Sequence, residues 1–351
     1  MKGIVLAGNR EVQILDFPDP TPGEGEVVLE IKASGLCGTD LKFYRNVGGA
    51  AGLGLGNLSG PIIAGHEPCG VVAAVGPGVS AKQARIGQRV MQHHYRGCGV
   101  CPQCSTGWMQ LCDEGVAEVY GATGHGAHAR YMKCPARTLV PLPDELSFAA
   151  GSAISCGTGT AWGALKRLDI AADHTIAVFG QGPVGLSATI LAHAMGARVI
   201  AIDTSPERLA TAVACGADLA INPAETPDVV QAIRGATRGR GAHLALDSSA
   251  APIARQQAAQ CVRTWGKVAY VGEGDSVTLN VSNDLLRRQV TVIGSWTFST
   301  VGQLDCARYI ADRGIDIDRL FTHRWKLDQA VEAYRVFDKQ TAGKAVIDPS
   351  A

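Results

Sequence analysis

The chain has 351 residues, of which 46% are hydrophobic and 18% charged, and its 32 Lys and Arg residues balance 32 Asp and Glu residues. The hydrophobic content argues against a disordered chain, and the lack of a basic excess argues against a protein that binds nucleic-acid phosphates. A folded chain of this size buries about three quarters of its open-chain surface, and its length favours two domains.

The sequence contains no apolar run of about 18 residues, so we expect no membrane span. The first residues lack the long apolar stretch and cleavage site of a secretory signal. The 11 cysteines are an odd number, and four of them lie within fifteen residues. In a large chain without a signal, this pattern favours thiolate metal ligands in a reducing compartment, and we expect a cytoplasmic protein.

The first 150 residues are predicted to be rich in β-structure, because short alternating runs are separated by Pro and Gly turns. The clearest of these runs are residues 27–31, 70–75 and 87–91. Residues 48–60 include six glycines, so we expect an irregular loop there.

After residue 174 predicted strands and helices alternate, which is typical of a parallel sheet covered by helices on both faces. The strands are expected at residues 175–179, 198–202, 219–221, 243–246, 268–271 and 290–293, and helices at 183–195 and 206–215. From about residue 301 the order is helix, strand, helix, strand. In the helix predicted at 328–337, Ala330, Val331, Tyr334 and Phe337 share one apolar stripe.

The segment from Gly180 to Gly185 has the pattern G-x-G-x-x-G, follows an apolar strand and begins a helix. In this context the pattern predicts a dinucleotide site. Gly180 permits a tight turn, Gly182 lets a pyrophosphate approach the backbone, and Gly185 lets the helix lie close to the strand. Pro183 and Val184 begin a helix, and the free N–H groups of its first turn would face the phosphates. An ordinary glycine turn is the alternative.

Asp203 ends the second strand, 23 residues after Gly180, where an acidic residue is expected to bind the adenosine ribose. Its charge would repel a 2′-phosphate, and no arginine is adjacent, Arg208 being the nearest. We therefore expect NAD rather than NADP. Arg208 and the strand-end residues Val271 and Gly272 complete the expected cofactor contacts.

Four cysteines, Cys98, Cys101, Cys104 and Cys112, have the spacing of a tetrahedral zinc site. Since four thiolates leave no open position on the ion, this zinc should be structural. The alternatives are unrelated buried cysteines or a disulfide pair. A second set of candidate ligands is dispersed in the sequence: Cys37, followed by Thr39 and Asp40, then His66 and Glu67, and much later Cys156.

In their order and separation these motifs resemble those of zinc-dependent medium-chain alcohol dehydrogenases, a family within the medium-chain dehydrogenase/reductase superfamily. The resemblance implies an α/β protein with a GroES-like catalytic domain (residues 1–150, including a zinc lobe at 93–113). A Rossmann domain (151–290) and a return to the catalytic domain (291–351) would follow. It also implies two Zn²⁺ ions per chain, and a homotetramer, with a homodimer as the alternative, because the segment between Cys112 and Gly121 is short.

The resemblance assigns the catalytic zinc to Cys37, His66 and Cys156, with Glu67 as a fourth or alternating ligand. Asp40 would fix the tautomer of His66, although capping of a helix that begins at Leu41 is an alternative role. Thr39 would accept the substrate proton, unless it is an ordinary turn residue. Lys42 stands where the family commonly has a histidine, and it is a weaker candidate for the proton relay.

These features predict reversible hydride transfer between an alcohol, favouring a secondary one, and NAD, with a small-molecule substrate and no nucleic-acid or membrane partner. A polyol or sugar-alcohol dehydrogenase is the alternative on the same scaffold. A zinc-free quinone reductase or structural protein would not need the three catalytic ligands, and a zinc-finger module would not need the dinucleotide loop. Phe43 and Trp296 are candidates for either the pocket wall or the core. His93, His94, His125 and His128 are expected to be structural or surface residues.

Overall fold

The computed structural model describes residues 1–50, 52, 60–341 and 343–350, and the chain forms two compact units. The β-rich unit consists of Met1–Gly159 and Phe298–Ala351, and the parallel-sheet unit of Thr160–Thr297. The sequence prediction placed these boundaries at 150/151 and 290/291. Helix α3 (Phe148–Ile154) packs on strands β3 and β4, which keeps residues beyond 150 in the β-rich unit. The loop predicted at 48–60 falls largely on residues outside the described part of the chain.

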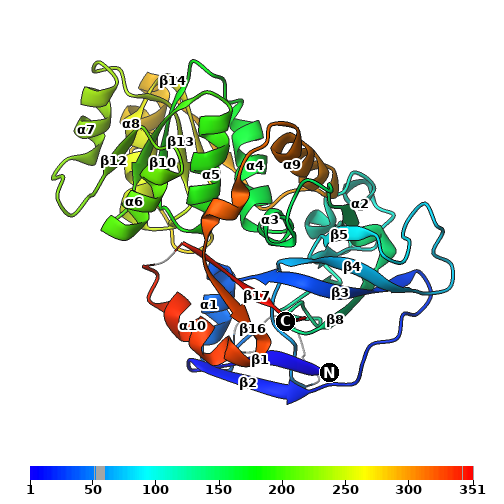
Figure 1. The fold of residues 1–351 in the computed structure, drawn as a ribbon. Helices are drawn as coiled ribbons and strands as arrows, with labels where there is room; N and C mark the ends of the chain where they lie inside the picture. Colours follow the sequence, from blue (N-terminus) through cyan, green and yellow to red (C-terminus); the bar gives the residue numbers. More distant parts are fainter. Residues whose placement is uncertain (51, 53–59, 342, 351) are drawn as a thin grey trace. The chain divides into compact units, whose positions relative to one another are not determined.

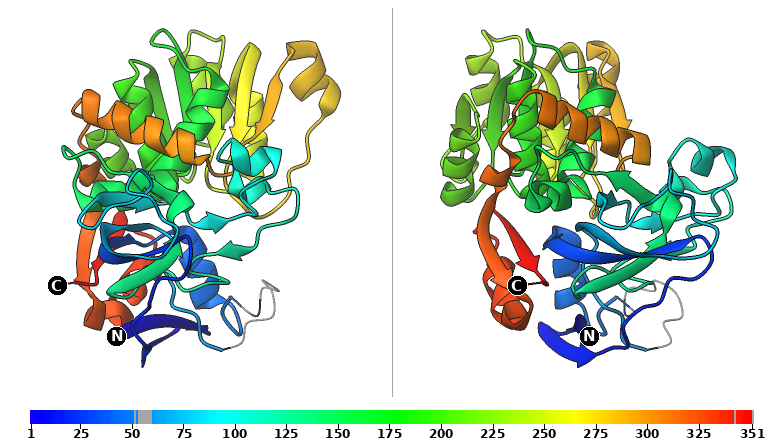
Figure 2. Two further views of the ribbon diagram at one scale, coloured as in Figure 1. Left: turned by 90° about the vertical axis from the view of Figure 1, so that its right-hand side faces the viewer. Right: turned by 45° about the vertical axis from the view of Figure 1, so that its right-hand side comes forward.

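The β-rich unit is organised around a sheet of seven strands in the order β16-β17-β3-β4-β5-β9, with β8 paired to β3. Figure 2 shows β3 and β8, drawn in blue and teal, side by side although they are distant in sequence. Two smaller sheets pair β1 with β2 and β6 with β7. The strands are β1 (Lys2–Gly8), β2 (Glu11–Asp16), β3 (Glu26–Gly35), β4 (Pro68–Val75), β5 (Arg89–Gln92), β6 (Tyr95–Arg96), β7 (Glu118–Val119), β8 (Tyr131–Pro135), β9 (Leu139–Pro141), β16 (Phe321–Lys326) and β17 (Lys344–Asp348).

Helices α1 (Gly38–Arg45) and α10 (Ala330–Asp338) share one apolar core with the C-terminal strand β17. Phe43 and Tyr334 are buried in this core, so Phe43 is a packing residue. The predicted stripe of α10 is wrong at Val331, which is 56% exposed, because the helix turns Ala333 inward instead. The other helices of the unit are α2 (Pro102–Ser105), α3, the first residues of α4 (Gly157–Leu168) and α9 (Thr300–Asp312).

The parallel-sheet unit has six strands in the order β12-β11-β10-β13-β14-β15, all parallel (Figure 1). This is the doubly wound order in which dinucleotides bind at the carboxyl ends of the strands. Its strands are β10 (Thr175–Phe179), β11 (Arg198–Ile202), β12 (Leu219–Ile221), β13 (Ala242–Asp247), β14 (Val262–Tyr270) and β15 (Thr291–Gly294). Its helices are most of α4 with α5 (Pro183–Ala194), α6 (Pro206–Ala214), α7 (Val229–Ala236) and α8 (Pro252–Cys261).

Both predicted helices of this unit begin at a proline that follows a capping residue. Gly182 precedes Pro183 in α5, and Ser205 precedes Pro206 in α6, where the serine side chain accepts a hydrogen bond from the Arg208 N–H at 3.3 Å. Proline is favoured at this position because its missing N–H would have no partner within the helix. Among the described residues, no helix has the length and hydropathy that a membrane crossing requires.

Candidate metal and dinucleotide sites

Three separate segments of the β-rich unit bring Cys37, His66, Glu67 and Cys156 together. Cys37 immediately precedes helix α1, His66 and Glu67 lie just before strand β4, and Cys156 lies between α3 and α4. All four are buried, and their candidate ligand atoms lie within 4.8 Å of one another. The two sulfurs are 3.9 Å apart. The sequence had suggested this set, and the fold assembles it.

The turn before His66 depends on Gly65, whose φ of +90° lies in the left-handed region that favours glycine. A Cβ atom at this position would also collide with the side chain of His128. Gly65 therefore allows the chain to enter β4 with His66 and Glu67 directed into the cluster.

Asp40 faces His66 and also caps helix α1. Its carboxylate lies 3.0 Å from His66 Nδ1 and accepts the Cys37 N–H at 2.8 Å. The helix begins at Gly38 and not at Leu41, so Asp40 caps it from within its first turn. Burial alone would lower the pKa of His66, but the charge of Asp40 and its hydrogen bond outweigh burial and raise that pKa. Because Nδ1 faces Asp40, Nε2 is the atom available to a metal.

The two buried sulfurs form a coupled pair. The hydrogen bond with Cys156 holds the pKa of Cys37 well below its usual value, and the pKa of Cys156 is raised well above it by the same contact. Two thiolates at this separation repel each other, so a cation between them would allow both to ionise, and two sulfurs with an imidazole suit Zn²⁺.

Glu67 has a partner that the sequence did not predict. Its carboxylate forms an ion pair with Lys344 of strand β17, and both residues are completely or almost completely buried. Lys344 also donates to the Leu36 carbonyl at 3.2 Å. Burial raises the pKa of Glu67 to about 7, with Lys344 opposing the shift. The sequence signal was a lone lysine at the start of an apolar strand.

His94, which was expected to be a structural or surface residue, is buried beside the candidate ligands. It is 2% exposed, and its ring meets that of His66 edge-on with 5.2 Å between centroids. Its Nδ1 lies 3.0 Å from the carbonyl oxygen of Ser155, the residue before Cys156. A carbonyl can only accept, so Nδ1 carries a proton. Burial lowers the pKa of His94 well below its usual value, which leaves Nε2 of the neutral ring as an acceptor.

The remaining relay candidates lie on the first two turns of α1. Thr39 is partly exposed two residues after Cys37, and Lys42 is exposed one turn further on. Their roles in the proton relay stay predictions.

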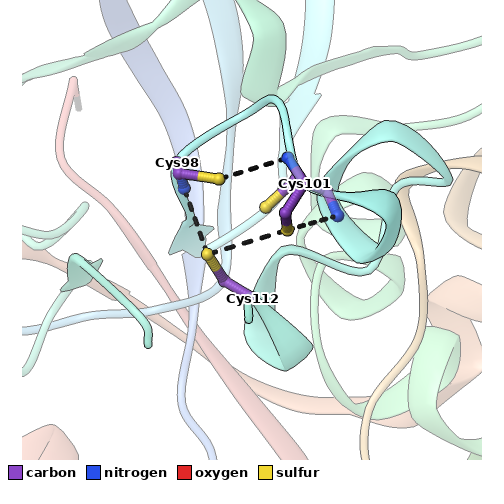
Figure 3. A group of neighbouring side chains, drawn as sticks. Cys98, Cys101 and Cys112 are labelled. Carbon is purple, nitrogen blue, oxygen red and sulfur yellow. Dashed lines mark hydrogen bonds between the residues drawn. The ribbon is translucent and has the colours of Figure 1, made fainter. Parts of the chain in front are cut away.

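The four cysteines of the second set also converge, with candidate ligand atoms within 4.8 Å of one another. Figure 3 shows the side chains of Cys98, Cys101 and Cys112 around one point. The sulfurs of Cys101 and Cys112 are 4.0 Å apart. Three of the sulfurs accept hydrogen bonds from backbone N–H groups. The sulfur of Cys98, for example, accepts from the Cys101 N–H at 3.3 Å. Cys104 completes the group.

The cysteines of this lobe have divergent acidities. Backbone N–H groups lower the pKa of Cys101 to about 7, whereas burial raises that of Cys104 to about 12. All four sulfurs can become thiolates when a cation compensates their mutual repulsion. A four-sulfur set fits a closed tetrahedral zinc site, and all 11 cysteines are free of disulfides.

In the parallel-sheet unit, each glycine of the dinucleotide loop has a distinct role. Gly180 turns with a φ of +83°, and a Cβ atom on Gly185 would collide with the Gly180 carbonyl. A Cβ atom on Gly182 would meet nothing within 4 Å. The loop thus leaves open space beside its second glycine, next to the N–H groups at the start of α5, as a bound pyrophosphate requires.

Asp203 lies at the end of β11 and contacts the glycine loop directly. Its two carboxylate oxygens accept the Gln181 N–H at 2.6 Å and the Ser205 N–H at 2.9 Å, and each keeps a lone pair. The first turn of α6 brings Arg208 to 4.0 Å from Asp203. No arginine is adjacent to Asp203 in the sequence, as expected. In the folded chain, however, Arg208 lies close to its carboxylate. Val271 and Gly272 donate their N–H groups to the carbonyl of Asp247 at the same edge of the sheet.

Comparison with known proteins decides the family. Residues 23–144 match the alcohol dehydrogenase GroES-like domain, and residues 183–311 match the zinc-binding dehydrogenase family. The chain belongs to the zinc-dependent medium-chain dehydrogenase family. It is 37% identical to the uncharacterized zinc-type alcohol dehydrogenase-like protein YphC of Escherichia coli, over 99% of this chain and 98% of that protein.

Two further relatives show the breadth of the family. The chain is 32% identical to a sorbitol dehydrogenase of Bacillus subtilis, over 95% of this chain and 92% of that protein. The structure of the alcohol dehydrogenase TADH from Thermus sp. ATN1 superposes with a TM-score of 0.89 and 27% identity, covering 99% of each chain. The chain is therefore an oxidoreductase of the zinc-type alcohol dehydrogenase class, with the GroES-like and Rossmann architecture predicted from its sequence.

Proposed function

We propose that the protein catalyses reversible hydride transfer between a neutral, preferably secondary, alcohol and NAD, with zinc held by Cys37, His66 and Cys156. The convergence of these three ligands beside Asp40 carries the proposal. Zinc bound there would act as a Lewis acid toward the oxygen of the substrate. The structural zinc is assigned to Cys98, Cys101, Cys104 and Cys112.

The chain's own residues have distinct roles in this proposal. Asp40 keeps the proton of His66 on Nδ1, so that Nε2 stays free for the ion. Glu67, balanced by Lys344, can approach or leave the ion as a fourth ligand. The Thr39 hydroxyl accepts the proton that the alcohol loses and passes it outward.

The test is a panel of primary, secondary and polyhydroxylated alcohols with NAD, followed at the nicotinamide absorbance, together with the metal content of the purified protein. Turnover of a secondary alcohol by protein that holds two zinc ions per chain would support the proposal. A protein with one zinc ion or none, or one that reduces quinones instead, would refute it.

We propose NAD as the cofactor because the Asp203 carboxylate occupies the position that faces the adenosine ribose. Replacing Asp203 with asparagine removes the charge while retaining an oxygen that can accept an N–H. With Arg208 4.0 Å away, we expect kcat/KM for NADP relative to NAD to rise by about tenfold, or about 1.4 kcal/mol.

Steady-state kinetics with both cofactors measures this ratio. The double variant Asp203→Asn with Arg208→Gln is the control, because it lacks the guanidinium that would bind the 2′-phosphate, and it should lose the gain. A parent enzyme that already prefers NADP would overturn the assignment of Asp203.

A polyol is the second candidate substrate, and His94 is the observation that favours it. Its Nε2 acceptor lies on a ring that packs against His66, where it can bind a second hydroxyl of the substrate. Replacing His94 with phenylalanine should lower kcat/KM for butane-2,3-diol by about tenfold, because the substrate would lose one hydrogen bond. The kcat/KM for butan-2-ol should stay nearly unchanged.

The ratio of the two kcat/KM values is the measurement, since it cancels losses common to both alcohols. His125→Phe provides the control, because His125 is exposed, packs against Phe17 and does not belong to the group of candidate ligands around Cys37. Equal losses for the diol and the simple alcohol would contradict a role of His94 in recognising a second hydroxyl.

We propose a cytoplasmic homotetramer, with a homodimer as the alternative. A cytoplasmic location is supported by the cysteines, all 11 of which are free of disulfides. Assembly is supported by β15, which ends the six-stranded sheet with an exposed edge, and by Val292, Leu286 and Val281, which are 42%, 60% and 56% exposed. Light scattering coupled to size-exclusion chromatography would give the mass in solution.

A further inference from the structure

One buried arginine of the parallel-sheet unit has a set of contacts that nothing above explains. Arg255 lies in the first turns of α8 and is 8% exposed. Its guanidinium donates to three carbonyls just beyond strand β14, those of Gly272 at 2.6 Å, Gly274 at 3.2 Å and Asp275. The segment 272–275, which we call the β14 loop, thus has most of its carbonyls directed at one side chain.

The same guanidinium faces a buried carboxylate at the end of the neighbouring strand β13. Arg255 Nε lies 3.5 Å from an oxygen of Asp247, which is completely buried. Asp247 in turn accepts hydrogen bonds from the Ser249 hydroxyl at 2.6 Å and from the N–H groups of Ser249 and Ala250. The carboxylate therefore holds the loop after β13 on one side and the arginine on the other.

The network continues to the glycine loop. The hydroxyl of Ser248 donates to the carbonyl of Gly180 at 2.9 Å, and a Cβ atom on Gly272 would collide with the backbone of Ala250. The loops that follow β10, β13 and β14 are thus joined at the carboxyl edge of the sheet. Dinucleotides bind at this edge, the two nucleotides on the two halves of the sheet. Strands β13 to β15 form the half opposite the one that ends at Asp203.

We propose that Arg255 is a positioning residue for the cofactor, because it fixes the β14 loop in the shape that receives the nicotinamide nucleotide. This inference rests on the proposed use of NAD. A loop with two glycines would lose conformational entropy on binding, and ordering it in advance removes that loss. Arginine is suited to the task because its planar group offers five donors in fixed directions, whereas lysine has one compact ammonium.

The experiment compares the binding of NADH with that of ADP, which occupies only the adenosine half, by isothermal titration calorimetry. In Arg255→Met the Kd for NADH should rise by roughly 10- to 100-fold, since ordering even one or two loop residues costs this much, while the Kd for ADP stays within twofold. Arg255→Lys should show most of the same loss, because one ammonium cannot bind three carbonyls.

Arg288→Met is the matched control. Arg288 also donates to three carbonyls in the same unit, those of Ala259, Val262 and Asp284, but Val262 begins β14 at the opposite edge of the sheet. Its loss should lower the melting temperature without changing the ratio of the two Kd values.

Several outcomes would count against the inference. If both Arg255 variants bind NADH as the parent does, or lose NADH and ADP affinity equally, Arg255 has no specific role at the nicotinamide half. Full recovery in Arg255→Lys would show that charge alone matters. If Arg255→Met does not fold, Arg255→Lys decides by the same ratio. A parent protein that binds no NADH would refute the proposed cofactor and, with it, this inference. If the parent binds NADH, the Arg255 variants test the role of Arg255 alone.

Discussion

Replacing Cys37 with serine is expected to lower kcat/KM by roughly a thousandfold, because the Lewis-acid contribution of a catalytic metal amounts to several kcal/mol and each 1.4 kcal/mol is tenfold. Cys37 is buried with Cys156 and His66, and a hydroxyl in place of its sulfur would remove the group whose pKa is already depressed in the cluster. The zinc content should fall from two ions per chain to one.

Binding of NADH to this variant should be unchanged, because the glycine loop and Asp203 belong to the other compact unit. Metal analysis, calorimetry with NADH and steady-state kinetics on the same preparation measure the three quantities. Cys306→Ala is the control for loss of a buried thiol, since Cys306 is completely buried in α9 and belongs to neither cysteine cluster. A Cys37→Ser variant that kept both its zinc and its turnover would refute the catalytic assignment.

The sequence was most informative where local signals mark both ends of an element. Strand β10 is a run of five buried residues bounded by His174 and Gly180, and the predicted and observed limits agree. Strand β11 agrees equally well. Helices α7 and α8 were not predicted: α7 is only eight residues long, and three of the ten residues of α8 are glutamines. The need to connect parallel strands by crossover helices is the signal that could have revealed them.

The residues of the candidate site also differ in how far the sequence could predict them. The four lobe cysteines are closely spaced, so their convergence could be predicted from the spacing, whereas the convergence of Cys37 with His66 was implied only by the resemblance to the family. Lys344 and His94 could not be assigned, because each acquires its role from a partner far away in the chain: Glu67 for the lysine, and the Ser155 carbonyl and His66 for the histidine. Pair contacts between distant segments exist only once the fold is formed.

Arg208 illustrates the difference between sequence distance and spatial distance. It is five residues from Asp203, yet the first turn of α6 returns it to the carboxylate. A helix repeats its direction every 3.6 residues, so a residue in the first turn of a helix can face the strand end that precedes it. We therefore expect cofactor preference to depend on this pair of side chains and not on Asp203 alone.

The two sets of candidate metal ligands differ in what surrounds them, and this difference predicts different consequences of removing a ligand from each. The Cys37 set adjoins a core of buried residues that includes Leu36 and Leu41, whereas the lobe has a small apolar cluster formed by Tyr95, Met109 and its own cysteines, with Val116 and Val119 packed against it. Such a small core cannot stabilise a fold by itself, so we expect a bound metal to supply most of the folding energy of the lobe.

Replacing Cys98 with serine is therefore expected to lower the melting temperature by about 10 °C, since the loss of several kcal/mol of metal binding shifts it by about 2–4 °C per kcal/mol. The loss of stability should extend beyond the lobe, because two hydrogen bonds join the lobe to the start of α9. Gln110 donates to the Phe298 carbonyl at 2.9 Å, and the Thr300 N–H donates to the Gly107 carbonyl at 3.0 Å.

Calorimetry, zinc analysis and turnover per folded chain distinguish this variant from Cys37→Ser. Each should lose one zinc ion, but Cys98→Ser should lose stability and keep turnover within about twofold at low temperature, whereas Cys37→Ser should lose turnover and keep most of its stability. A Cys98→Ser protein that melted like the parent but had lost its turnover would show that the lobe takes part in the chemistry. Since a closed four-thiolate site leaves the ion no position for substrate, the structure predicts the opposite.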